Sequence, residues 1–219
     1  MVTYEQIRKN EAIKTYITEA DSVLCAIGYT EHSFAHVTKV STVASEILLK
    51  LGYSKQDAEL AKISGYLHDI GNIVNRVEHS QTGAVMAFRI LDNMGMEPEN
   101  IATIISAIGN HDVGVGVPVN PVAAALILAD KSDVRRSRVR NSDETTFDMH
   151  DRVNYSVINS ELLIEKENKI IKLKLRIDTT YGSVMDYFEI FLDRMILCRK
   201  AAELLGYSFK LDINGQQLI

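Results

Sequence analysis

Residues 65–71 read Gly65-Tyr66-Leu67-His68-Asp69-Ile70-Gly71, an apolar helical run that ends in an adjacent imidazole and carboxylate. Neighbouring residues of a helix project about 100° apart, so His68 and Asp69 can reach adjacent positions around one ion. Four more residues of metal-binding types lie on or at the ends of apolar helical stretches on either side: His36, His79, His111 and Asp130. Imidazole and carboxylate together suit Fe, Mn, Co, Ni or Zn. The stretch therefore predicts a helical protein built around a buried metal centre.

In chain order these six residues form the pattern H…HD…H…H…D, which resembles the HD superfamily of metal-dependent phosphohydrolases over roughly residues 30 to 140. The resemblance implies one or two divalent transition metals and hydrolysis of a nucleotide or another small phosphate ester by metal-activated water. It implies one metal on His36, His68, Asp69 and Asp130, and a second on His79, His111 and a bridging Asp69. His68 and Asp69 would then be the catalytic pair, because a bridging carboxylate holds two metals roughly 3.5–4 Å apart in hydrolytic sites.

Two other histidines need separate interpretations. His32 lies one helical turn before His36 and competes for its role. The distance from His36 to Gly52 fits the family's helix better, so we expect His32 to line the mouth of the cleft. His150 lies in a polar stretch, residues 148–151, and is expected in a surface loop.

A basic cluster follows Asp130 in the run Lys131-Ser132-Asp133-Val134-Arg135-Arg136-Ser137-Arg138-Val139-Arg140. A solvated helix end is the ordinary interpretation of such a run. Its place directly after an expected metal ligand also favours contacts with substrate phosphate, for which arginine offers a planar fork. The candidates are Lys131, Arg135, Arg136 and Arg138, whereas Arg140 is expected to lie too far away.

Asn72 is a further candidate for contacting substrate phosphate. In the HD-GYP subgroup, which hydrolyses cyclic dinucleotides, a lysine follows the HDIG run, and here Asn72 stands in that place. The stretch Gly114-Val115-Gly116-Val117-Pro118 also lacks that subgroup's tyrosine. The sequence therefore argues against cyclic dinucleotides as the substrate.

The expected fold class is mainly α: an HD-type helical bundle with a small C-terminal β-hairpin plus helix. Apolar periodicity and capping residues predict helices over about residues 3–26, 31–51, 54–69, 79–94, 98–111 and 121–130. Ser54 and Asp57 form a capping box. Pro98 and Pro121 open the fifth and sixth helices.

The pattern changes after residue 140. Apolar residues alternate with charged ones over residues 171–178, which predicts a strand, and about residues 153–165 are expected to pair with it. A last helix carries an apolar stripe with heptad spacing: Val184, Phe188, Phe191, Met195, Cys198, Ala202 and Leu205. Residues 207–213 are a candidate for a short final strand.

We therefore expect two parts. Residues 1–145 would be the metal-binding domain with its N-terminal helix, and residues 146–219 an extension packed on it. A two-stranded hairpin alone is marginally stable, so the extension needs a partner surface. One interpretation is that the extension packs only within the chain. The other is that it also forms a homodimer, which buries the stripe or extends the sheet across a two-fold axis.

Composition narrows the classes of partner and location. The 219 residues are 46% hydrophobic and 24% charged, an ordinary globular balance. A net charge of -5 argues against a general grip on nucleic acid. No apolar run approaches the roughly 18 residues of a membrane span, and the N-terminus is too polar for a signal peptide. Cys25 and Cys198 lack any metal or redox spacing, so we expect reduced cysteines in a cytoplasmic protein. The expected partner is a small phosphorylated substrate.

Three functions from different classes remain open. The leading hypothesis is a metal-dependent phosphohydrolase, either a phosphomonoesterase or a phosphodiesterase. The second is a di-iron oxygenase, because some HD proteins use the same six-ligand set for oxidation. The third is a regulatory module that binds a nucleotide without turnover. Asn72 and the unassigned C-terminal part motivate this third hypothesis, and the complete ligand set argues modestly against it.

Overall fold

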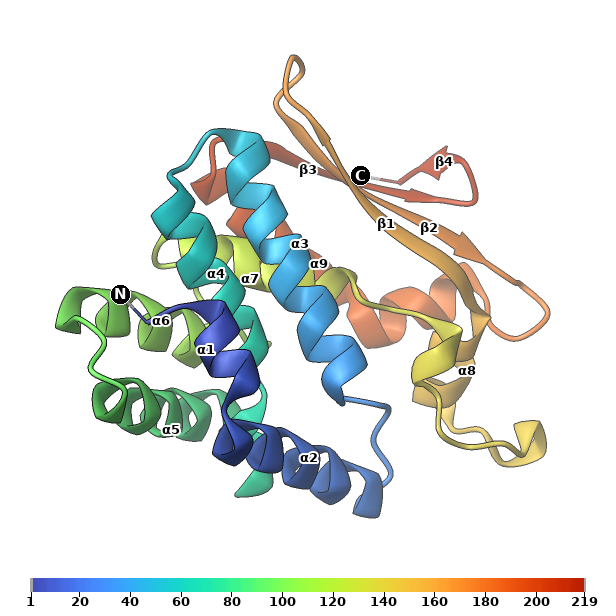
Figure 1. The fold of residues 1–219 in the computed structure, drawn as a ribbon. Coiled ribbons are helices and arrows are strands. Elements are labelled where there is room, and N and C mark those ends of the chain that lie inside the picture. The colour runs from blue at the N-terminus through green and yellow to red at the C-terminus, as the bar shows by residue number, and fades with distance from the viewer. Residues whose placement is uncertain (1, 219) are drawn as a thin grey trace.

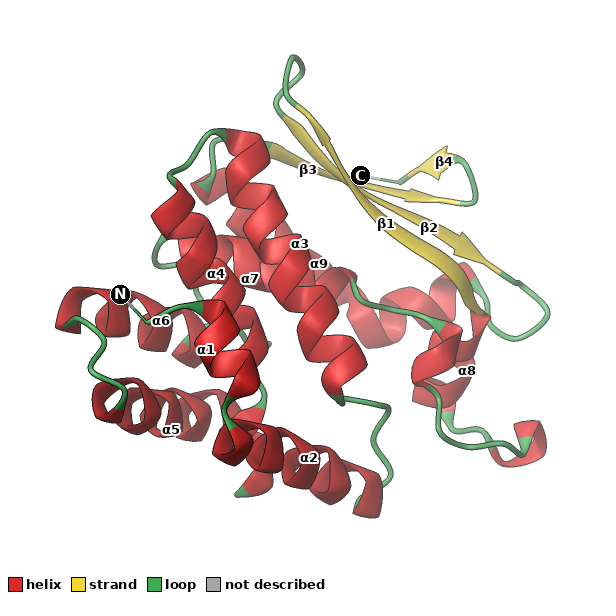
Figure 2. Cartoon of the chain, in the orientation of Figure 1, coloured by secondary structure: helices red, strands yellow, loops and turns green. Residues whose placement is uncertain are grey.

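The computed structural model describes residues 2–218, and its helices occupy the larger part of the molecule in Figures 1 and 2. The longer helices are α1 (Tyr4–Lys9), α2 (Glu11–Ala26), α3 (Phe34–Leu51), α4 (Lys55–Leu67), α5 (His79–Asn93), α6 (Pro98–Gly109), α7 (Pro121–Ser132), α8 (Met149–Ser156) and α9 (Val184–Leu204). Short 3₁₀ turns are η1 (Ile70–Ile73), η2 (Arg136–Arg138) and η3 (Glu144–Thr146). Among residues 2–218, no helix combines the length and the apolar character that crossing a membrane requires.

The expected single N-terminal helix is divided, which corrects one prediction. Asn10 ends α1 with an extended backbone and at the same time caps α2, where its side chain accepts a hydrogen bond from the Ile13 amide at 3.2 Å. Asparagine competes for backbone donors in this way and so favours helix ends over helix interiors. The other predicted helices are present with ends that differ by a few residues, and the capping box of Ser54 and Asp57 is present.

Helices α3, α4 and α7 pack against one another at the centre of the helical part (Figure 1). Residues 122–129 of α7 are buried on every side, which explains their unbroken apolar character. Gly65 of α4 lies so close to α3 that an added Cβ would meet the Ser41 Cα at 2.7 Å. This close approach of two backbones brings His36 on α3 and His68 at the end of α4 to the same point.

The C-terminal part contains a four-stranded sheet rather than a hairpin alone. Its strands are β1 (Val157–Glu165), β2 (Ile170–Ile177), β3 (Ser208–Ile213) and β4 (Gln216–Gln217), in the order β1-β2-β3-β4. β1 and β2 are antiparallel, and β3 runs parallel to β2 after the crossover through α9. The alternating residues of β2 bury one apolar face, as the sequence predicts.

The start of the first strand is a second correction. Residues 153–156 belong to α8, and β1 begins only at Val157. Asp148 caps α8 by accepting a hydrogen bond from the Asp151 amide at 2.7 Å, and this local signal decides for helix. His150 therefore lies on a helix instead of in a loop, although it is exposed as expected.

Helix α9 lies between the sheet and the helical part, and it contacts β3 on one side and α7 on the other (Figure 1). Its apolar stripe is buried at Phe191, Met195, Cys198 and Ala202. The stripe thus finds its partner surface within the chain. This packing also brings residues of α9 close to the end of α7, where Asp130 lies.

Candidate metal centre

All six residues of the H…HD…H…H…D pattern converge on one point. His36 comes from the first turn of α3, His68 and Asp69 follow α4, and His79 begins α5. His111 follows α6, and Asp130 lies in the last turn of α7. The four histidines and Asp69 are buried, and Asp130 keeps 12% of its side chain exposed. Helix ends and first turns, rather than helix faces, therefore deliver most of these side chains.

The two carboxylate oxygens of Asp69 face different histidines. Oδ2 lies 3.1 Å from His68 Nε2 and 3.6 Å from His36 Nε2. Oδ1 lies 3.5 Å from His79 Nε2 and 4.0 Å from His111 Nε2. Asp130 Oδ1 joins the first pair, at 3.4 Å from His36 Nε2 and 3.8 Å from His68 Nε2. Asp69 is thus the residue shared by two groups of possible ligands.

The hydrogen bonds of the histidines fix which nitrogen is free. Each Nδ1 faces an oxygen acceptor: Asp133 Oδ2 for His36, and the carbonyl oxygen three residues earlier for His68, His79 and His111, at 2.6–3.0 Å. Because these oxygens can only accept, each Nδ1 carries the proton. The Nε2 lone pairs therefore point into the site, and such an oxygen partner on the far nitrogen is what metal-binding histidines commonly have.

The spacing of the Nε2 atoms fits a metal. His36 Nε2 lies 3.3 Å from His68 Nε2, and His79 Nε2 lies 3.3 Å from His111 Nε2. Two nitrogens bound to one metal at about 2.0–2.1 Å with a tetrahedral angle lie about 3.3 Å apart. Two lone pairs at this distance repel unless a cation lies between them. The donor set therefore fits one metal on each histidine pair, and geometric triads that could hold an ion include His36, His68 and Asp130.

Gly71 explains why the run continues Asp69-Ile70-Gly71. An added Cβ at Gly71 would overlap the carbonyl oxygen of His79 and the amide nitrogen of Gly83 on α5. Only glycine allows the η1 turn to approach the start of α5 this closely. The approach places His79 beside Asp69. Gly71 thereby allows the second group of possible ligands to form.

Comparison with known proteins agrees with this geometry. A family model described as the HD domain matches residues 33–135. We refer to residues 33–135, the part that this model matches, as the HD domain. The chain is also similar to the uncharacterized protein MJ1020 of Methanocaldococcus jannaschii, with 26% identity over 161 residues, which is 63% of this chain and 61% of that protein. The chain thus spans about three fifths of the length of this curated relative.

Among solved structures, the chain is similar to one described as a predicted HD superfamily hydrolase from an uncultured Thermotogales bacterium. The identity is 25%, the alignment covers 57% of this chain and 67% of that one, and the TM-score is 0.46.

The electrostatics of the HD domain keep the carboxylates ionised. Burial pushes the pKa of Asp69 upward, but the surrounding imidazoles, His68 above all, hold it well below its usual range. Burial also raises the pKa of Asp130, but Lys131, His36 and His68 together hold this pKa well below its usual range. Burial lowers the pKa of His111 to about 3, with His68 and Lys131 adding to the effect. At neutral pH both carboxylates are therefore anionic and the His111 imidazole is neutral.

Asp133, three residues after Asp130, is a buried carboxylate that orients His36. Its Oδ2 accepts from His36 Nδ1 at 2.8 Å, and its Oδ1 pairs with Lys39 at 2.8 Å and Arg135 at 3.0 Å. Burial raises the pKa of Asp133, and the hydrogen bond from His36 with the charges of Arg138 and Lys39 lowers it far more. Asp133 therefore stays anionic and fixes the tautomer of His36.

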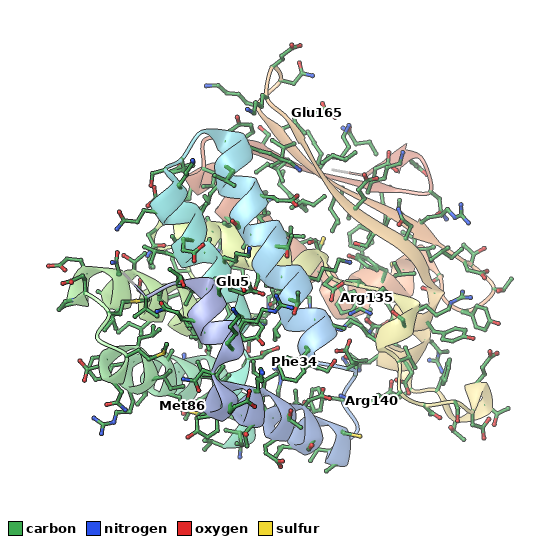
Figure 3. All side chains as sticks on the ribbon, viewed as in Figure 1. Glu5, Phe34, Met86, Arg135, Arg140 and Glu165 are labelled. Atoms are coloured by element: carbon green, nitrogen blue, oxygen red, sulfur yellow. The ribbon has the colours of Figure 1, made fainter. Side chains whose placement is uncertain are left out.

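The basic residues after Asp130 divide into two groups. Lys131 and Arg138 line the cavity at the HD site, as the phosphate hypothesis requires. Arg135, which Figure 3 labels, does not line it. Its guanidinium pairs instead with Glu31 and Asp133. Arg136 donates to the Tyr155 carbonyl at 2.6 Å and lies over the rings of Tyr155 and Tyr181, which ties α8 to η2. Arg135 and Arg136 therefore lie outside the cavity lining and have partners within the protein.

Two other candidates have structural partners. Arg140 does not line the cavity, and it donates to the Tyr29 carbonyl at 3.2 Å and to Asp21. Asn72 is buried, and its amide donates to the carbonyl oxygen and to Oδ1 of Asp69, at 2.9 and 3.0 Å. Asn72 does not line the cavity, so its contacts point to orienting Asp69 and not to binding substrate phosphate.

The cavity above the cluster has a volume of about 410 Å³. One wall comes from the HD domain and the other from the segment before it and from the C-terminal part. His32 lines the cavity, as expected, and so does His150. Such a volume is in the range of small-ligand pockets.

Sequence reasoning missed three residues that line this cavity. Asp112 forms a geometric triad with His79 and His111, and it lies 3.5 Å from Lys131 Nζ. Its signal was a second His-Asp dipeptide, His111-Asp112, which repeats His68-Asp69. Arg76 Nη1 lies 3.2 Å from His79 Nε2. Arg194 enters from α9, and no local pattern marks it.

Proposed function

We propose that this protein is a metal-dependent phosphohydrolase that acts on a nucleotide or another small phosphate ester through a dinuclear centre. The observation that supports this most directly is the orientation of Asp69, whose two oxygens face two separate histidine pairs. A carboxylate in this arrangement is suited to bridging two metals, as two-metal hydrolytic sites require.

His36, His68, Asp69 and Asp130 would hold one metal, and His79, His111 and Asp69 the other. Metals bound there supply an acidified water and neutralise phosphoryl oxygens. Asp112 extends the second group and is anionic. Burial raises the pKa of its carboxyl, but Lys131 and the imidazoles lower that pKa by more than burial raises it.

The protein's own charges position the substrate. Lys131 Nζ lies 2.6 Å from Asp130 Oδ2 and lines the cavity, so its ammonium group is placed to bind a phosphoryl oxygen beside the cluster. Asn72 and Asp133 hold Asp69 and His36 in the orientation that the centre needs. The walls of the cavity then select the substrate.

The test is a screen of the purified protein. Elemental analysis should find one to two transition-metal ions per chain, and the protein loaded anaerobically with Mn, Co, Ni or Fe should release phosphate or a phosphate monoester from at least one ester in a broad panel. Chelation should remove the activity and metal should restore it. A loaded protein inactive on the whole panel would contradict the proposal. Oxygen uptake by the iron form would assign oxygenase chemistry instead.

A further inference from the structure

Arg194 differs from the other cationic side chains that line the cavity. Among residues 2–218, Arg76 has Asp112 and Asn72 as partners, Lys131 has Asp130 and Asp112, and Arg138 donates to the Glu31 and Asp133 carbonyls. Within residues 2–218, Arg194 has neither a hydrogen-bond acceptor nor a carboxylate within ion-pair distance. Its guanidinium lies over the Phe191 ring at 4.3 Å.

The side chain of Arg194 is half-buried and lines the cavity. Its neighbours along the same face of α9, Phe191, Met195 and Cys198, are buried against α7 and the sheet. Burial lowers the pKa of the Arg194 guanidinium, and the Asp130 carboxylate opposes that shift, so the charge lies within the field of the cluster. The guanidinium donors of Arg194 therefore need acceptors from water or a ligand. The cavity is where those acceptors can come from.

Arg194 and the cluster line the same cavity but come from different elements of the fold. Lys131 already places a cation beside Asp130, where the reacting phosphoryl group would bind. Arg194 enters the cavity from α9, and Asp148, His150 and Asn154 line it from α8 and from the residue that caps α8. The volume of about 410 Å³ leaves room for a molecule that contacts both the cluster and Arg194.

We propose that Arg194 binds a second anionic group of the substrate, a carboxylate or a phosphate, while the His/Asp cluster takes the reacting phosphoryl group. This rests on the proposed function in that the cluster is assumed to bind a phosphoryl group. A guanidinium binds such oxyanions through two parallel hydrogen bonds. The substrate class is then a phosphate ester that carries a further acidic group, and the residue that selects it lies outside the HD domain.

The experiment measures binding without turnover. Metal-loaded protein is titrated calorimetrically with ω-phosphonoalkanoic acids of increasing chain length, each compared with the alkylphosphonate of the same length. These probes share an anion that is not hydrolysed and differ only in the second anion. We expect at least one of the acids to bind about tenfold or more tightly than its alkyl match, the scale of a charged hydrogen bond.

The variants assign that preference to the residue. Arg194→Met should abolish it and leave alkylphosphonate affinity and metal content unchanged, and Arg194→Lys, which keeps the charge but not the fork, should retain part of it. Arg199→Met, at an exposed position of the same helix, is the matched control and should behave as the parent protein. If the methionine variant does not fold, the comparison is made with the lysine variant and with Arg194→Gln.

Three results would overturn the proposal: no preference at any chain length, a preference that survives in the Arg194 variants, or an equal loss of affinity for both probe types. The last result would place Arg194 at the reacting group instead. A protein that binds the probes as expected but hydrolyses no ester would leave the role of Arg194 standing and remove the hydrolase proposal. The two failures are therefore distinguishable.

Discussion

The HD domain and the C-terminal segment, residues 146–218, contribute to the same cavity in different ways. The HD domain supplies the cluster, and three of its four histidines are held by a carbonyl three residues earlier in the chain. The C-terminal segment supplies a wall that contains His150, Asn154 and Arg194, whose spacing follows no motif. Residues that must meet a metal are confined to a few types and positions, whereas residues that meet the rest of a ligand are free to vary. The comparison suggests that chemistry belongs to the first region and selection to the second.

The largest effect is expected when the two regions are separated. Ending the chain after residue 145 removes α9 and exposes the apolar side of α7 that it covers. We expect a fragment that keeps its metal-ligand residues but aggregates, which size-exclusion chromatography with light scattering would detect. A soluble fragment with full metal content would show that the HD domain is independent of the segment.

Replacing Asp69 tests the HD side of the comparison. Asp69→Asn should keep the fold and lower kcat/KM at least about a hundredfold, or roughly 3 kcal/mol of barrier, because an amide cannot bridge two cations. Asp92→Asn, at an exposed position on α5, is the control. Full activity of the Asp69 variant would rule out the bridging mechanism.

Replacing Asp133 tests how the cluster is oriented. Asp133→Asn removes the negative partner of His36 Nδ1 and should weaken metal binding about 10–100-fold, measured by competition with a chelator. The variant should also melt at a lower temperature, because Arg138 and Lys39 lose their buried counter-charge. Unchanged affinity with a lowered melting temperature would reduce Asp133 to a purely structural role.

The homodimer remains a prediction about the C-terminal segment. β1 is an edge strand, and Met185 and Leu192 of α9 are exposed at 75% and 48%, which leaves apolar surface for a second copy. Light scattering of the intact protein at micromolar concentration should give the mass of two chains. The mass of one chain would remove the dimer and leave the packing of α9 within the chain unaffected.

The smallest effect concerns the reactivity of the two cysteine thiols, Cys25 and Cys198, which have no role in the proposed function. Burial raises the pKa of Cys198 on α9 to about 12, so at pH 8 this thiol stays protonated and is not a nucleophile. Cys25 is exposed. A thiol reagent at pH 8 should therefore modify one cysteine quickly and the second only after unfolding. Rapid modification of both would show that α9 opens readily from the HD domain.

Local signals in the sequence predicted much of the helical part. Ser54, Pro98 and Pro121 mark helix starts through hydrogen bonds and backbone angles that involve only their near neighbours. The two corrected predictions, at Asn10 and at residues 153–156, also depend on local signals. The helix caps formed by Asn10 and Asp148 outweigh the apolar pattern there. The place of the fourth strand in the sheet, and the parallel pairing of β2 with β3, had no such signal since they join distant segments.

The sequence by itself determined the helical class, the order of the six cluster residues and the glycine that lets them meet, since metal chemistry and close backbone approach restrict residue type at fixed positions. Only the tertiary structure decided which charges face the cavity. Arg135 and Arg136 follow the cluster directly yet pair with Glu31, Asp133 and the Tyr155 carbonyl, whereas Arg194 enters from a distant helix. The direction of a long side chain depends on the partners that packing brings within its reach, and those partners come from segments far apart in the chain.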